Sequence, residues 1–198
     1  MKFNTVQLTS KEMYKLLTGS VVPRPIAWVS TISTKGELNL APFSFFTVAS
    51  RQPPMLCISV GPGVGEREGT EKDTLVNIRS QKEFVVNVVP SYLGNEMQKT
   101  AENFPSHVNE IEVAGLTPID SEIVQPKRIK ESPIHMECKL EHIIPLGSDH
   151  LIIGKVVMYH IDDEYYLGNY KVNLEKLRPL GRLAGNYSEL DTFFKLPR

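Results

Sequence analysis

The stretch "NLAPFSFFTVASRQPP", residues 39–54, alternates aromatic residues with small hydroxyl-bearing ones and contains a proline near its start. A strand that only filled a core would be more aliphatic and would lack the internal proline. We expect Pro42 to remove one ladder hydrogen bond and to bend the strand outward, exposing the amides of the residues that follow. Such a surface suits the polar edge of a flat heteroaromatic ring. A bulged barrel strand whose hydroxyls bond neighbouring carbonyls explains the pattern equally well.

Other β-rich runs on both sides of this stretch predict an all-β barrel with short peripheral helices. Strands are expected at 26–33, 38–50, 55–60, 83–90, 133–146 and 150–161. Helices are expected at 9–17, 74–81 and 91–104. Strands and helices do not alternate as a doubly wound α/β sheet requires, so that fold is excluded. No repeat or clear linker occurs, and we expect a single domain over residues 1–198.

Composition excludes several classes of protein. Hydrophobic residues make up 41% of the chain and charged residues 23%, which is typical of soluble globular proteins. The net charge is −1 without a basic run, which argues against nucleic-acid binding. The N-terminus lacks the apolar core of a signal peptide, and no window approaches the about 20 apolar residues of a membrane-spanning helix. Cys57 and Cys138 lie far apart, so we expect reduced thiols and a cytoplasmic protein.

Several familiar site motifs are missing from the sequence. It contains no Gly-x-Gly-x-x-Gly between a strand and a helix, no Walker pattern, no Gly-x-Ser-x-Gly and no His-Glu-x-x-His. His135 and Glu137 alternate onto one strand face. An exposed polar face of a hairpin explains this pair better than a metal site does, so we expect no metal.

Three segments carry polar groups suited to an anion or a substrate. In "EKDTLVNI", Lys72 supplies charge and Thr74 a hydroxyl at a helix N-terminus, where a phosphate is favoured, with Asp73 facing away as a cap. Arg24 lies between two prolines on a stiff segment and is suited to gripping an anion. His150 follows a turn at the expected barrel rim and is a candidate to meet a substrate. The alternative for Lys72 and Thr74 is an ordinary capped helix. Arg24 could instead form a surface salt bridge, and His150 could be a turn histidine without a role.

Seven segments in register resemble the flavin reductase-like family of FMN-binding split barrels. They are "VPRPIAWVST", "NLAPFSFFTVASRQPPML", "EKDTLVNI", "EFVVNVV", "ESPIHMECKLEHIIPLG", "HLIIGKVV" and "LRPLGRLAGNYSEL". The resemblance extends from about Gly19 to Leu190. It implies a six-stranded, Greek-key split β-barrel that works as a homodimer and holds FMN near the dimer interface.

The resemblance also implies a set of flavin-contacting residues. These cofactor-binding candidates are Arg24, Thr31, Asn39, Pro42, Phe43, Ser44, Phe45, Phe46, Ser59, Lys72, Thr74, Asn77 and Tyr187. Tyr187 would pack over the ring, from the partner subunit. Relatives that reduce free flavin carry a Gly-Asp-His turn whose histidine lies near the nicotinamide. Here the turn reads Ser148-Asp149-His150, and His150 is the catalytic candidate. The long loop at 61–71 also departs from the family pattern. It would either cover the site as a lid or be a slack segment.

From this resemblance we expect NAD(P)H-dependent flavin reduction, with hydride transfer from NADH or NADPH to the flavin N5. The electrons would pass to an oxygenase, a small acceptor or an electron-transfer protein. FMN is the expected cofactor, with FAD as the alternative. A flavoredoxin-like electron carrier and a non-catalytic flavin-binding protein are the competing hypotheses.

Overall fold

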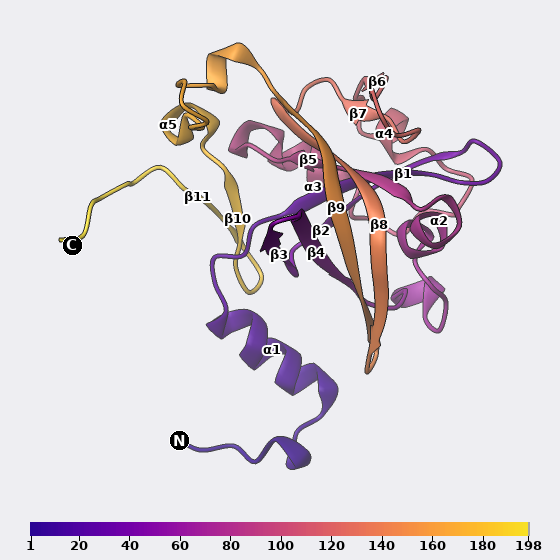
Figure 1. The fold of residues 1–198 in the computed structure, drawn as a ribbon. Coiled ribbons are helices and arrows are strands. Elements are labelled where there is room, and N and C mark those ends of the chain that lie inside the picture. Colours follow the sequence, from indigo (N-terminus) through magenta and orange to yellow (C-terminus); the bar gives the residue numbers. More distant parts are fainter. Residues whose placement is uncertain (198) are drawn as a thin grey trace.

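A computed structural model describes residues 1–197 of the chain, and its centre is one antiparallel sheet of seven strands (Figure 1). The strands follow the order β2-β1-β5-β8-β9-β4-β3. They are β1 (Ala27–Ile32), β2 (Leu38–Phe43), β3 (Phe46–Arg51), β4 (Pro54–Val60), β5 (Glu83–Val88), β8 (Ile134–Leu146) and β9 (Asp149–Ile161). Two small sheets pair β6 (Pro118–Ile119) with β7 (Arg128–Ile129), and β10 (Leu180–Arg182) with β11 (Tyr187–Glu189).

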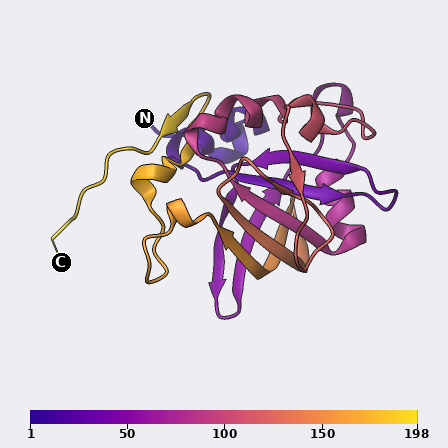
Figure 2. The same ribbon diagram turned by 90° about the horizontal axis from the view of Figure 1, so that it is seen from above.

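The helices are short and lie around the sheet. The α-helices are α1 (Ser10–Ser20), α2 (Asp73–Gln81), α3 (Gly94–Lys99), α4 (Glu110–Val113) and α5 (Leu174–Leu177). Single 3₁₀ turns are η1 (Thr5–Gln7), η2 (Gly65–Arg67), η3 (Ser91–Leu93) and η4 (Asp163–Tyr165). The α1 helix stands away from the main sheet, and the last described residues run outward as an extended arm (Figures 1 and 2). In residues 1–197 no helix combines the length and the apolar character needed to cross a bilayer. The mainly β architecture with short helices is therefore confirmed.

The count of strands differs from the six that were expected. The run 38–50 forms two strands, because the chain turns a corner at Ser44 and Phe45 between β2 and β3. These consecutive strands lie at opposite ends of the sheet order, so the corner joins its two edges. The Phe45 carbonyl accepts a hydrogen bond from Ser59 N at 2.8 Å, which anchors the corner to β4.

Pro42 does not bend the strand, contrary to expectation. It lies inside β2 and pairs opposite Trp28 of β1. Leu40 N donates to the Glu110 carboxylate instead of to β1, and backbone groups two residues apart on a strand point the same way. The nitrogen of Pro42 therefore faces away from β1, and the edge strand loses no ladder hydrogen bond. The bend follows two residues later.

The β8–β9 hairpin carries a buried polar cluster on the face that was expected to be exposed. His135 is 3% exposed and Glu137 is 0% exposed, so the expectation of an exposed polar face was wrong. The segment 121–124 covers this face and donates three backbone N–H groups to Glu137. His160 lies 2.7 Å from the same carboxylate through Nε2. Burial raises the pKa of Glu137, but these hydrogen bonds outweigh it and hold the pKa below its ordinary value.

Two hydrophobic clusters sandwich β1 and position the surrounding segments. Ala27 and Val29 point into the barrel, where Phe84 and Ile58 also lie. Trp28 points to the opposite face and packs under the segment that contains α3 and α4. Its Nε1 donates to Thr100 Oγ1 at 2.8 Å. The contacts of Trp28 hold this outer segment against the sheet, and the segment therefore lies beside the edge of β2.

Candidate functional site

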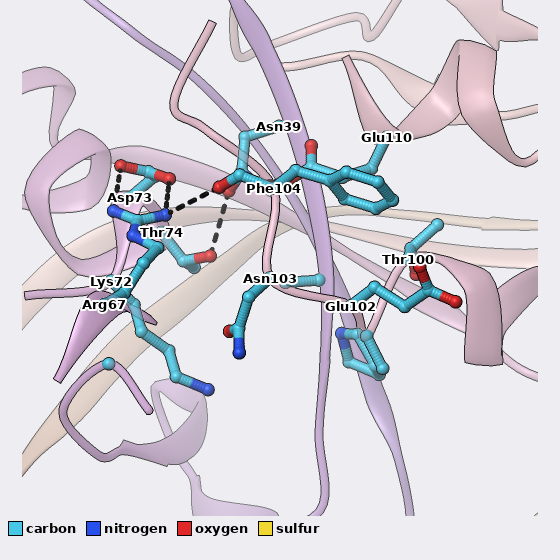
Figure 3. Close-up of a pocket in the computed structure, with 14 residues that line it drawn as sticks. Asn39, Arg67, Lys72, Asp73, Thr74, Thr100, Glu102, Asn103, Phe104 and Glu110 are labelled. Atoms are coloured by element: carbon cyan, nitrogen blue, oxygen red, sulfur yellow. Dashed lines mark hydrogen bonds and ion pairs between the residues drawn. The ribbon is translucent and has the colours of Figure 1, made fainter. Parts of the chain in front are cut away.

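A cleft opens between the outer edge of β2, the start of α2 and the segment 100–104 (Figure 3). Its cavity volume is about 80 Å³. Polar and charged side chains dominate its lining, among them Asn39, Arg67, Lys72, Asp73 and Glu110. Phe104 contributes an aromatic wall and Pro42 lies on the β2 side. This cleft is the candidate site.

The N-terminus of α2 presents unsatisfied donors to the cleft. Lys72 is the N-cap residue, and its side chain makes no capping hydrogen bond. Asp73 N and Thr74 N, in the first turn, have no acceptor in the described part of the chain, as is usual for the start of a helix. The Lys72 ammonium lies 5.5 Å from the Phe43 ring centroid and has no carboxylate within 4.0 Å among residues 1–197. Burial, followed by the charge of Arg67, lowers the pKa of Lys72.

Asp73 does not face away from this site as expected. Its carboxylate lines the cleft and is held by Arg67, whose two terminal nitrogens bind the two carboxylate oxygens. Figure 3 shows this pair, with the Lys72 amino group directed away from it. Sequence reasoning did not identify Arg67, because an arginine in a loop carries no local signal of the side chain that it contacts.

Four of the predicted residues gather behind the cleft in one buried network. Asn39 Oδ1 accepts hydrogen bonds from Thr31 Oγ1 at 3.1 Å and from Thr74 Oγ1 at 2.9 Å. Asn77 Nδ2 donates to Thr31 Oγ1 at 3.0 Å. Asn39 Nδ2 donates to Glu110 Oε1 at 2.8 Å, and burial raises the pKa of that carboxyl. The hydroxyls are committed to Asn39, so they stiffen the wall of the cleft.

Arg24 and Ser44 meet at the corner between β2 and β3 instead of lining the cleft. Arg24 is 6% exposed, and its guanidinium donates to the carbonyls of Thr18, Val21 and Leu183 at 2.7, 2.8 and 2.9 Å. Its Nε lies 3.4 Å from Ser44 Oγ. Arg24 therefore ties α1 and the C-terminal segment to the corner, and most of its donors are already used. Both earlier readings of Arg24, as a surface salt bridge or as a free anion grip, differ from this arrangement.

The remaining predicted residues lie at other places. Phe45 is 38% exposed beside Tyr14, with ring centroids 6.3 Å apart, and Phe46 packs on the barrel core. Ser59 donates to Asp149 Oδ2 at 3.2 Å. Tyr187 donates to Gln98 at 2.6 Å.

His150 does not line the cleft. It lies in a separate surface hollow with Arg79, His142, Ile143 and Pro145. The structure therefore does not bring the catalytic candidate together with Lys72 and Asn39.

The loop at 61–71 forms one wall of the cleft. Gly63 N donates to Thr70 O at 2.9 Å, and Asn103 Nδ2 donates to Val64 O at 3.1 Å. A Cβ on Gly63 would collide with the backbone carbonyl oxygen of Arg67, so this close approach requires glycine. The loop is internally bonded and tied to Asn103, which contradicts the slack-segment reading. In residues 1–197 no group of three or more metal-ligating side chains comes together.

The family model of the flavin reductase like domain matches residues 18–178. This chain belongs to that family. A protein of Aquifex aeolicus is 46% identical over 187 residues, and the match covers 94% of both chains. Nitrilotriacetate monooxygenase component B from Bacillus cereus is 39% identical, with a TM-score of 0.94 over 99% of this chain and 98% of that one. The 2-nitrobenzoate 2-nitroreductase NbaA of Pseudomonas fluorescens is 31% identical, with a TM-score of 0.90 over 100% and 96%.

Members of this family are flavin reductase-like, and the residues that line the cleft of this chain fit the phosphate end of a flavin nucleotide. Among residues 1–197, Lys72 offers a half-buried ammonium without a carboxylate partner, and the start of α2 offers N–H donors without an acceptor. An anion at a helix N-terminus gains from both the donors and the helix dipole. The cavity of about 80 Å³ matches a phosphate-sized group and is smaller than the roughly 300 Å³ of a typical ligand pocket.

Proposed function

We propose that this protein is an FMN-binding oxidoreductase that takes hydride from NADH or NADPH and passes the electrons to a separate acceptor. Family membership supports flavin binding. The observation that carries the choice of FMN is the Lys72 ammonium at the start of α2. A phosphomonoester bears up to about two negative charges, and each phosphate of the FAD pyrophosphate bears about one, so a site that holds a single phosphate favours FMN.

In this proposal the bound flavin supplies the hydride-accepting chemistry, and the protein supplies binding and orientation. Lys72 and the first N–H groups of α2 would hold its phosphate. The Thr31–Asn39–Thr74 network would keep the wall beside that phosphate rigid. Hydride transfer needs no side-chain acid or base, and the proposal does not depend on His150.

We infer a partner oxygenase as the acceptor, because component B of the Bacillus cereus nitrilotriacetate monooxygenase is similar over nearly the whole chain. A nitroaromatic compound is the second candidate acceptor, and the similarity to the Pseudomonas fluorescens nitroreductase favours it. Mixing the reduced protein anaerobically with 2-nitrobenzoate tests this candidate directly. Reoxidation of the flavin without added oxygenase would support it.

A homodimer is part of the proposal, since the cleft beside Lys72 has room only for a phosphate-sized group. Apolar side chains lie exposed around the β2–β3 corner, including Tyr14, Phe45 and Val48 at 57%, 38% and 65% exposure. A second copy packed on this corner would cover them and provide a wall for the flavin ring. Light scattering on the eluted protein tests this, and a monomeric mass would contradict it. Both cysteines are free, which supports the proposed reducing, cytoplasmic location.

The test of function is a flavin titration followed by anaerobic reduction. The protein should quench FMN fluorescence on binding, and NADH or NADPH should then bleach the visible flavin band at about 10 s⁻¹. Protein that binds FMN but stays yellow with both nicotinamides is an electron carrier or a flavin-binding protein. Protein that binds no flavin contradicts the proposal altogether.

The phosphate site is tested by Lys72→Met. Loss of a charged hydrogen-bond donor should weaken FMN about tenfold or more. Riboflavin, which lacks the phosphate, should bind the variant and the wild type equally. Equal FMN affinity in both proteins would remove Lys72 from the site.

A further inference from the structure

We propose that Arg67 is a positioning residue that neutralises Asp73 at the start of α2, and thereby allows a flavin phosphate to lie beside Lys72. This inference rests on the proposed function. It assigns the loop 61–71 a role in selecting a phosphorylated flavin over an unphosphorylated one.

The geometry places a carboxylate where an anion is to bind. Asp73 is the first residue of α2, and its side chain lines the same cleft as Lys72. A free carboxylate there would oppose a phosphate and would also compete with it for Lys72. The bidentate contact with Arg67 occupies both oxygens of Asp73. The side chains of Arg67 and Asp73 are 26% and 20% exposed, so water screens this pair less than a surface pair.

The loop fixes Arg67 in this position. Arg67 N donates to Val64 O at 3.2 Å, and its carbonyl accepts from Thr70 N and Thr70 Oγ1 at 3.1 and 2.7 Å. The guanidinium also donates to Phe104 O at 3.3 Å, which joins the loop to the opposite wall of the cleft. The internal hydrogen bonds of the loop therefore hold the backbone that delivers the guanidinium to Asp73.

The experiment compares Arg67→Gln with the double variant Arg67→Gln/Asp73→Asn. FMN and riboflavin are titrated separately into each protein, and binding is read from flavin fluorescence. In the single variant FMN should weaken about tenfold, as a carboxylate is uncovered beside the phosphate, while riboflavin changes less than about twofold. In the double variant FMN affinity should return to within about threefold of wild type, because the opposing charge is gone.

Arg79→Gln is the matched control. Arg79 lies on α2, the helix that begins with Asp73, and forms a bidentate pair with Glu71. This pair is exposed and lies outside the cleft. The control should leave the FMN to riboflavin ratio unchanged, and circular dichroism checks that each variant folds.

The outcomes separate the hypotheses. Equal weakening of FMN and riboflavin in Arg67→Gln would show that Arg67 only supports the loop, and would overturn the inference. A double variant as weak as the single one would overturn it too, since removal of the Asp73 charge would then not matter. A wild-type protein that binds FMN and riboflavin equally, or binds neither, would overturn the phosphate site of the proposed function and this inference with it.

Discussion

Acidification should destabilise this protein through His135. The side chain is 3% exposed, its Nε2 lies 2.8 Å from Ile129 O, and its Nδ1 has no hydrogen-bond partner in the described part of the chain. Burial, with added repulsion from Arg128 and His160, lowers the pKa of His135 from 6.5 to about 4. The imidazole is therefore neutral in the fold and takes up a proton on unfolding below pH 6.5. The stabilisation is present above that pH and is lost as the pH falls toward 4.

The size of the effect follows from the shift in pKa. At about 1.4 kcal/mol per unit, His135 should cost the fold about 3 kcal/mol between pH 7 and pH 4. His135→Gln keeps a donor for Ile129 and removes the titration. Urea unfolding, followed by the fluorescence of the single tryptophan, should show a loss on acidification that is about 3 kcal/mol smaller in the variant.

Glu137 and His160 face the same cluster and are unchanged in this comparison. The exposed His107, replaced by glutamine, serves as the control. Equal loss of stability on acidification in wild type and His135→Gln would refute the reasoning.

Two further changes test the packing and the site. Gly154→Ala should lower the free energy of unfolding by about 1–3 kcal/mol, because the new Cβ would lie 2.6 Å from Phe84 Cε1 in a full core. Gly19→Ala in α1 meets nothing within 4 Å and should raise stability by about 0.5–1 kcal/mol, and urea melts of both variants check the contrast. Thr74→Val should cost about 1 kcal/mol of stability by removing one donor to Asn39, yet weaken FMN less than about threefold. A large loss of FMN affinity in Thr74→Val would instead restore its hydroxyl as a direct ligand contact.

Local patterns in the sequence predicted the local features of the fold. The helix expected at 9–17 is α1, which begins with a capping box of Thr9 and Glu12 and continues to Ser20. The run 55–60 matches β4, and the alternating runs after residue 132 form the long β8–β9 hairpin. The corner at Ser44 was missed because it connects strands at opposite ends of the sheet order, an arrangement that no local pattern encodes.

Side-chain partners far apart in sequence were the features that could not be predicted. Glu110 bonds Asn39 from 71 positions away, and Arg24 bonds Leu183 from 159 positions away. Glu110 accepts from a side-chain amide and Arg24 donates to a backbone carbonyl. Such groups occur throughout the chain, so the sequence does not indicate which of them is the partner. The grouping of Thr31, Asn39, Thr74 and Asn77 was expected through resemblance, but their mutual hydrogen bonding follows only from the three-dimensional arrangement.

The two-residue corner between β2 and β3 has a consequence for how the chain assembles during synthesis. The two edge strands, β2 and β3, are synthesised one after the other. The β8–β9 hairpin, which lies between them in the sheet order, is synthesised much later. Nascent chains therefore carry two open strand edges through most of translation, the condition under which misassembly competes with slow, long-range pairing.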